Sequence, residues 1–336
     1  MTADLAYYSL VAVYSAMAIY TISFVAYALD LAKRSGDAQL AAKEASSLDG
    51  GRAPVASAST ARGSSTVVLD RPATTIGGDT TDSSGRRRPS RFERVATSLM
   101  VLGLVVHVAS VIMRGVAAER VPWANMFEFS LTGTAIIVGV YLLVKQFVDI
   151  SFLGAYVMGL NLILLAIGTV NYYVAVVPLQ PALQSAWLVI HVLVAILGTG
   201  FFAIAAGLSI AQLIQTRREQ AKLAGLGFMQ TLPGADRLED LAYRVALVGF
   251  VLWTFTLIAG AVWAERAWGR YWGWDTKEVW TFIIWVLYAG YIHARATRGW
   301  RGSRSSWLSI IGFAAVMFNF SVVNVFFKGL HAYSGL

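Results

Sequence analysis

Cysteine is missing from the sequence, and charged residues are scarce. Among 336 residues there is no cysteine, so the chain forms no disulfide, holds no iron–sulfur cluster and carries out no thiol chemistry of its own. Only 14% of the residues are charged, whereas a soluble domain has about 25%. Together with a hydrophobic share of 57%, this scarcity excludes an ordinary soluble protein.

Acidic residues are fewer than basic ones. The sequence has 27 Lys and Arg against 19 Asp and Glu, which gives a net charge of +8. In a membrane protein such an excess is typical of basic cytoplasmic loops rather than of a nucleic-acid-binding surface. We therefore expect membrane lipid, and no nucleic acid, among the partners.

Apolar blocks of about 20 residues, each long enough to cross a bilayer, recur along the chain. They predict an all-α fold, a polytopic membrane bundle of about eight transmembrane helices. The expected spans are approximately 5–29, 95–116, 127–147, 150–170, 186–214, 244–264, 279–295 and 307–327. We accordingly divide the chain into a first transmembrane helix (1–29), a loop (30–94) and a membrane domain (95–336) with a tryptophan-rich loop at 265–280.

The segment 30–94 has the composition of a disordered cytoplasmic loop. It is rich in Ser, Thr, Ala, Gly and Arg, has few aromatic residues and ends in GRRRPSR, so it cannot bury a core of its own. Basic loops mark the cytoplasmic side, and two shorter ones follow the fifth and seventh spans. With eight spans, both termini and the tryptophan-rich loop then lie outside the cytoplasm. We expect a multi-pass protein of the cell membrane.

The tryptophan-rich loop contains the stretch WGRYWGWDTKEVW, from Trp268 to Trp280, in which four of thirteen residues are tryptophan. Six of the eleven tryptophans of the chain fall between Trp253 and Trp280. Tryptophan is common at membrane interfaces, but an interfacial belt would spread over the ends of all spans. The concentration on one loop favours a binding surface. Within it, Asp275 and Glu278 have the spacing of a helix cap with its capping box.

The four histidines sort into two pairs by their depth in the predicted membrane. His107 and His293 lie within spans, whereas His191 and His331 lie near the outer ends of spans. A lone histidine in a span is often a satisfied core residue, yet an ionisable group there is also a functional hypothesis. Two histidines that face each other from different helices are what a bis-histidine heme site needs. The first pair becomes level only if the helices are tilted or offset, because His293 lies nearer the inner end of its span.

The other side chains near the histidines suit a planar, apolar, anionic ring better than a zinc ion. The histidines have no local H-x-x-x-H spacing, which zinc sites commonly use. Indoles offer flat faces and N–H donors, and Arg270 and Lys277 are placed to pair with carboxylates of such a ring. Arg114, seven residues after His107 on the same helix face, is placed to do so within the membrane. The alternative is that each cation only snorkels to the interface.

Three stretches resemble one known family. WGRYWGWDTKEVW resembles the WWD signature of the CcsA (ResC) family, membrane proteins of the System II machinery for cytochrome c maturation. VPWANMFEFS (Val121–Ser130) is similar to the family's Pro-x-x-Asn-x-Tyr-Glu-Ser stretch, with Phe127 in place of Tyr and Phe129 in place of Ser. GLHAYSGL is similar to the family's C-terminal ending, and the four histidines have counterparts in the same order. The resemblance covers most of 95–336 and does not extend to 30–94.

This resemblance implies a heme-binding subunit of a cytochrome c synthetase. Heme b is then the cargo: it is taken up at a membrane pair, here His107 and His293, and held outside by a second pair, here His191 and His331. The heme platform would comprise Trp268, Trp272, Trp274 and Asp275. At this platform the CxxCH motif of an apocytochrome c receives the heme. The implied partners are apocytochrome c, a ResB/CcsB-type membrane protein and a thioredoxin-like thiol reductant.

Two other functions stay open on the sequence alone. One is a diheme membrane cytochrome that transfers electrons, which turnover with a quinol would support. The other is a transporter of a different amphipathic substrate, with the histidines as proton relays, which the heme content of the purified protein would test. No side chain has a strong claim as a general base, so no catalytic residue is assigned.

Overall fold

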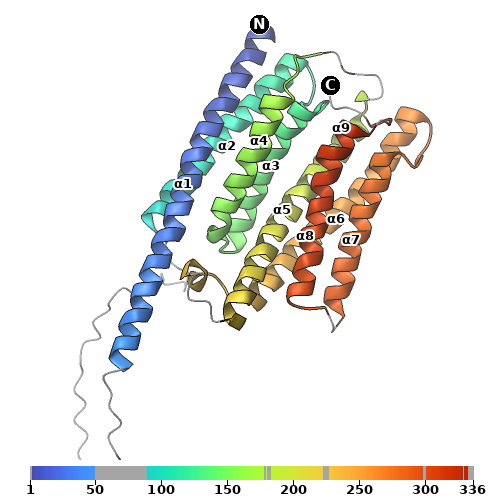
Figure 1. Ribbon diagram of the computed structural model, residues 1–336. Helices are drawn as coiled ribbons and strands as arrows, with labels where there is room; N and C mark the ends of the chain where they lie inside the picture. Colours follow the sequence, from blue (N-terminus) through green and yellow to red (C-terminus); the bar gives the residue numbers. More distant parts are fainter. Residues whose placement is uncertain are drawn as a thin grey trace, which may run out of the picture.

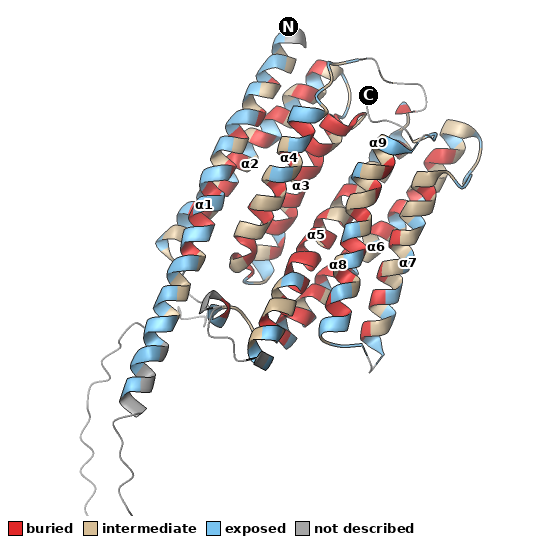
Figure 2. Ribbon diagram, in the orientation of Figure 1, coloured by how far each residue is buried: buried red, intermediate tan, exposed pale blue. Residues whose placement is uncertain are grey.

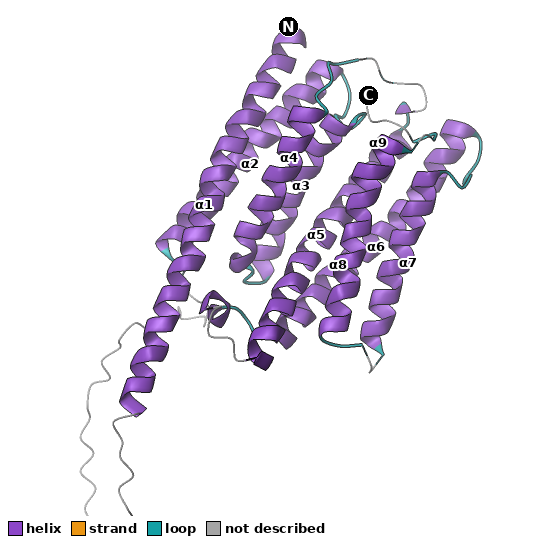
Figure 3. Ribbon diagram, in the orientation of Figure 1, coloured by secondary structure: helices purple, strands orange, loops and turns teal. Residues whose placement is uncertain are grey.

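Long helices lie side by side in one bundle (Figure 1), and the described part of the chain contains no strand. The computed structural model describes residues 2–49, 89–177, 179, 183–221, 227–297, 300–327 and 329–331. The long helices are α1 (Thr2–Asp49), α2 (Arg91–Ala118), α3 (Met126–Phe147), α4 (Gly154–Asn171), α5 (Ala186–Ala221), α6 (Ala235–Trp268), α7 (Thr276–Ala296) and α8 (Ser303–Phe318). Shorter elements are η1 (Ser151–Leu153), η3 (Gly227–Thr231), the π-helix η4 (Asn319–Val323) and α9 (Asn324–Phe326). The predicted all-α class is confirmed (Figure 3).

Seven helical segments in the described ranges are long and apolar enough to cross a membrane. Six of them correspond to α1 through α6, and the seventh joins α8 to α9. The helix α7, where the sequence predicts a span at 279–295, is not among them, because its tryptophans, tyrosines and His293 are less apolar than Leu, Ile or Val. It nevertheless lies alongside α6 and α8 (Figure 1). The chain is a multi-pass membrane protein with one helix less apolar than expected.

The helices form two groups that meet where α3 packs on α5. In the first group α1 packs on α2 and α4, and α3 packs on α4; in the second, α5 packs on α6 and α8, and α7 packs on α8 (Figure 1). The start of α1, the helix α9 and the loop between α6 and α7 lie at the same end of the bundle (Figure 1). We call this the α9 end. Its location outside the cytoplasm stays a prediction.

Burial follows this arrangement. Buried residues recur along the helices inside the bundle, such as α3 and α5, and exposed residues are most frequent along α1 (Figure 2). The tightest aromatic contact joins α5 to α7, where the rings of Phe202 and Tyr288 stack with centroids 3.6 Å apart. Large apolar side chains such as Val105, Val251 and Ile258 are exposed. A lipid-facing surface requires such side chains, since hydrocarbon is their natural solvent.

The first helix extends beyond its predicted end at residue 29. Residues 30–49 continue α1 as helix, so the predicted loop is wrong for that part, while 50–88 lie outside the described residues. The reason is local: this stretch has five Ala and three Leu among its twenty residues, and both residue types favour helix. Arg34 pairs with Asp30 one turn before it and, at 2.8 Å, with Glu93 of α2. These ion pairs attach the extension to the bundle.

Side-chain caps fix where two helices begin at the α9 end. Asn125 Oδ1 accepts from Glu128 N–H at 2.9 Å and starts α3. At the start of α7 the predicted capping box is present, with Glu278 Oε2 accepting from the N–H groups of Asp275 at 3.1 Å and Gly273 at 2.8 Å. A cap satisfies backbone donors that a helix start leaves unpaired. Both caps therefore set the angle at which the preceding loop approaches the space between the helices.

Candidate functional site

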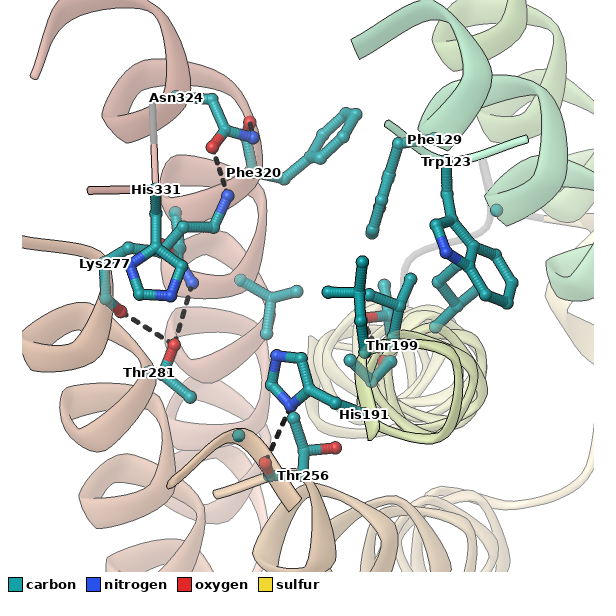
Figure 4. Close-up of a pocket in the computed structure, with 18 of the residues that line it drawn as sticks. Trp123, Phe129, His191, Thr199, Thr256, Lys277, Thr281, Phe320, Asn324 and His331 are labelled. Carbon is teal, nitrogen blue, oxygen red and sulfur yellow. Dashed lines mark hydrogen bonds between the residues drawn. The ribbon is translucent and has the colours of Figure 1, made fainter. Parts of the chain in front are cut away.

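A large cavity lies at the α9 end, between α3, α5, α6, α7 and η4. About 1520 Å³ inside it is free of protein atoms, counting the part open to solvent. Its walls are mainly apolar and aromatic. The polar and aromatic side chains that define it include Trp123, Phe129, His191, Lys277, Phe320 and His331 (Figure 4).

His191 enters the cavity from the second turn of α5. Its Nδ1 lies 2.9 Å from the Thr256 carbonyl oxygen of α6. Because a carbonyl only accepts, Nδ1 carries the hydrogen and Nε2 keeps its lone pair. Gly260, one turn after Thr256, leaves a notch for the ring: a Cβ there would lie 2.7 Å from His191 Cε1.

His331 enters from the chain segment after α9. Its Nδ1 lies 2.7 Å from Asp275 Oδ2, and the other oxygen of that carboxylate accepts from Leu330 N–H at 3.1 Å. The hydrogen bond from His331, opposed by partial burial, holds the pKa of the Asp275 carboxyl below its usual range. The carboxylate is therefore ionised at neutral pH and accepts the Nδ1 hydrogen. Again the ring presents Nε2 as the free nitrogen.

The two histidines share one aromatic neighbour. The Trp263 indole stacks on His191 at 5.9 Å between centroids, with 15° between planes, and meets His331 edge-on at 5.4 Å. In Figure 4, Trp123 and Phe129 lie on the side of the cavity opposite His331. The site thus offers two imidazole rings, each bound through Nδ1, and flat apolar walls.

This donor set decides what kind of metal the cavity suits. Among the described residues no group of three or more His, Cys, Asp or Glu side chains is placed to hold a metal ion. A bare zinc ion takes three or four protein ligands, so two histidines are too few. A metal already held by a planar macrocycle needs only two axial ligands, which is the number present. The residues therefore fit a metalloporphyrin.

Of two further predicted cations, Lys277 lines the cavity and Arg270 lies in the adjoining loop. Lys277, in the first turn of α7, donates from Nζ to Asn324 Oδ1 of α9 and lines the cavity. The Arg270 guanidinium lies 3.8 Å from Glu278 and occupies the space that any side chain at Gly273 would fill. A side chain at 273 would displace the flexible end of Arg270. Both cations come from the tryptophan-rich loop or directly follow it.

The predicted platform residues separate into three positions. Trp272 lines the cavity, and Trp268 lies beside it with its ring 4.7 Å from that of His331. Trp274 points away: its side chain is 73% exposed, and its backbone has a φ of +59°, which is uncommon for a bulky residue. Asp275 bonds the tail through its carboxylate. The structure thus makes Asp275 a partner of a histidine rather than part of a flat surface.

Arg114 is buried in an ion-pair cluster. Only 1% of it is exposed, and its Nε donates to Glu128 Oε1 at 3.0 Å. Arg120 donates to the same carboxylate at 2.6 Å, and Ala124 N–H donates to it at 3.0 Å. The cluster fixes the loop that carries Trp123 into the cavity. Arg114 itself is not among the residues that line the cavity.

The two histidines predicted within the membrane are not brought together. His107 is fully buried on α2, with its Nδ1 3.3 Å from the Tyr20 hydroxyl of α1, and its Nε2 is buried without a hydrogen bond of ordinary geometry. His293 is exposed near the far end of α7 from the cavity. The helices α2 and α7 lie on opposite sides of the bundle (Figure 1). Two histidines that both lie within predicted spans thus need not lie on adjacent helices.

Several site features had little or no signal in the sequence. The π-helix η4, which places Asn319 and Phe320 in the cavity wall, has no recognisable sequence pattern. The Thr256 acceptor is a backbone carbonyl, which side-chain reasoning cannot find. Trp123 did have a signal, because it is an aromatic residue in a loop at the outer end of two spans. The cap at Asn125 that positions it could also have been inferred.

Comparison with known proteins agrees with this geometry. Residues 123–331 match the model of the family described as cytochrome C assembly protein. The cytochrome c biogenesis protein CcsA of Guillardia theta is 35% identical over 244 residues, which cover 66% of this chain and 80% of that protein. CcsA of Gloeobacter violaceus is 30% identical over 301 residues, covering 74% of this chain and 89% of the relative.

A solved structure shares the fold. The cytochrome c heme lyase CcmF superposes with a TM-score of 0.60 and 15% identity over 94% of this chain, which spans 46% of the CcmF chain. At that identity the likeness concerns the fold alone. Taken together, the helical bundle and the family match define a multi-pass membrane protein of cytochrome c maturation. The chain belongs to the CcsA/ResC family.

Proposed function

We propose that this chain holds heme b as its cargo in the cavity and presents it for covalent attachment to the CxxCH motif of an apocytochrome c. His191 and His331 are the axial ligands. One observation carries the proposal: two imidazoles from different elements meet one aromatic cavity, each with its Nδ1–H donated elsewhere and its Nε2 available. Two such imidazoles in one aromatic cavity are the donor set that a bis-histidine heme uses.

The cavity walls supply the remaining binding energy. A porphyrin exposes a large apolar surface, and its removal from water contributes about 25 cal/mol per Å². Trp123, Phe129 and Trp272 offer the flat faces for this burial. Lys277 and Arg270 stand at the edge, where they pair with propionates, the arginine through its two-pronged guanidinium. The ring is thereby oriented as well as held.

Attachment needs groups that this chain does not supply. The thiols come from the apocytochrome, because the sequence contains no cysteine. The contribution of the chain is to position the heme edge beside those thiols, which turns an encounter in solution into a local reaction. We infer that the chain is a component of a holocytochrome c synthase complex. Its proposed partners are a ResB/CcsB-type membrane protein and a thioredoxin-like reductant, which keeps the substrate thiols reduced.

The proposal places the α9 end outside the cytoplasm, in the cell membrane. A thiol reagent that cannot cross the membrane should label a single cysteine at Gly273 in intact cells and should not label one at Ser57. The absence of cysteine makes the background clean. We further propose that His107 and His293 serve heme uptake from the membrane. If His107 and His293 were to bind one iron, α2 and α7 would have to approach each other.

The direct test is heme content. Purified full-length protein should give the pyridine hemochrome spectrum of b-type heme and a low-spin bis-histidine visible spectrum. His191→Gly and His331→Gly should convert it to a five-coordinate or weak-ligand spectrum that added imidazole reverses, since a free ligand refills the vacated position. Protein purified without heme from heme-replete cells would overturn the proposal.

A further inference from the structure

The two histidines of the cavity are held in different ways. His191 lies on a helix, in a notch at Gly260, and its partner is the backbone carbonyl of Thr256. Ring and acceptor belong to α5 and α6, which pack against each other along their lengths. The hydrogen bond of His191 thus joins two membrane helices that pack against each other. His191 is therefore a fixed ligand.

His331 is held by one side chain. It follows α9 outside any helix, and the Asp275 carboxylate accepts from both its ring and the backbone of Leu330. Gly329 permits this close approach, because a Cβ at that position would collide with Asp275 Oδ1. The ring otherwise meets the indoles of Trp263 and Trp268 edge-on. Its release breaks one carboxylate contact and moves no long helix.

From this asymmetry we infer that His331 is the exchangeable axial ligand and that Asp275 is the positioning residue that retains it. The inference rests on the proposed function. The imidazole of the CxxCH histidine forms a bond to the iron as the bond to His331 Nε2 breaks. The iron keeps six ligands, and no electron is transferred. His191 stays on the opposite face, so the incoming segment approaches from the side of the tail.

The exchanged side can be identified by spectroscopy, without measuring cytochrome c assembly. Carbon monoxide added to the reduced heme of the purified full chain replaces the more weakly held histidine. A laser pulse then removes it and leaves iron bound to the retained histidine alone. Resonance Raman spectroscopy reads the iron–histidine stretch, which is higher when the histidine donates to a carboxylate than to a carbonyl. We expect the wild-type photoproduct to show the iron–histidine stretching frequency of the His331→Gly variant, in which only His191 remains. The frequency of His191→Gly would overturn the inference.

Two variants test Asp275 without removing a ligand. Asp275→Asn removes the charge, and Gly329→Ala pushes the tail away from the carboxylate. A hydrogen bond to a charged group is strong enough that its loss should speed carbon monoxide association by about tenfold or more. The stretch after photolysis should not change, because His191 is untouched. Glu119→Gln, which removes an exposed carboxylate at the same end of the bundle, is the matched control and should bind at the wild-type rate.

The outcomes separate this inference from the proposed function. If the chain binds no heme, both fail. If it binds heme but the photoproduct retains His331, only the inference fails. Wild-type association rates in both Asp275→Asn and Gly329→Ala would likewise overturn the role of Asp275. Faster association in both, with an unchanged photoproduct and a silent Glu119→Gln, supports it.

Discussion

The outer and inner histidines differ in what surrounds them. His191 and His331 reach one cavity, stand against one indole and each donate Nδ1–H to a fixed acceptor. His107 is buried against Tyr20 in one helix group, while His293 is exposed in the other. Of the four histidines, only the first two line this cavity. Two histidines within spans thus do not form a site unless their helices are neighbours and their side chains face each other.

The largest expected effect concerns the outer pair. His191→Gly and His331→Gly should abolish cytochrome c assembly, and imidazole should restore part of it. Trp272→Ala should also abolish assembly, but imidazole should not help, because the lost element is a surface and not a ligand. Assembly measured by heme staining of a reporter cytochrome c checks this. Equal rescue of both classes would show that the tryptophan does not act as a wall.

The second effect concerns the support of the cavity rather than its ligands. Glu128→Gln leaves Arg114 and Arg120 buried without their counter-charge, and such a loss costs about 3–5 kcal/mol. Thermal unfolding in detergent should show a large drop in stability. Glu119→Gln, exposed nearby, is the control and should be near neutral. A stable Glu128→Gln protein would mean that water or lipid headgroups compensate the arginines.

Substitution of the two inner histidines should change the stability of the protein to different extents. His107→Ala removes a fully buried ring and leaves the Tyr20 hydroxyl without this partner, at a cost of about 1–3 kcal/mol. His293→Ala, on an exposed site, should change the free energy of unfolding by less than about 0.5 kcal/mol. Heme content should be measured on both. An equal loss of heme in the two variants would indicate that the helices rearrange to form the predicted membrane pair.

The smallest effect concerns Trp274. Its left-handed backbone costs a non-glycine residue about 1–3 kcal/mol, and its exposed indole regains little of that by packing. Trp274→Gly should therefore raise the unfolding temperature slightly. If the indole contacts the incoming substrate, cytochrome c assembly should fall at the same time. If the Trp274→Gly variant is more stable and fully active, the backbone strain at Trp274 has no role in cytochrome c assembly.

The sequence predicted where the helices lie along the chain better than it predicted which segments contact one another. Hydropathy located the helices, and the Asp275–Glu278 spacing located the cap of α7, because both signals are local. The pairing of His331 with His191 was predicted from their depth and from the resemblance, but the bond of His331 to Asp275 was not predicted, since 56 residues separate the two. Arg114 was predicted to pair with a carboxylate of the bound ring. Its partner is Glu128, which lies on another helix and so could not be identified from local spacing. Contacts between distant segments have no local signature unless a known pattern supplies one.

The π-helix η4 determines how the chain reaches the tail. A π-helix of this length equals an α-helix with one residue inserted, and each residue turns an α-helix by about 100°. Everything after Val323 is rotated by that amount relative to α8. Deletion of one residue within 319–323 would return the helix to α register and turn Asn324 away from Lys277. A single inserted residue thus determines the direction in which the end of the chain leaves α8 toward the cavity.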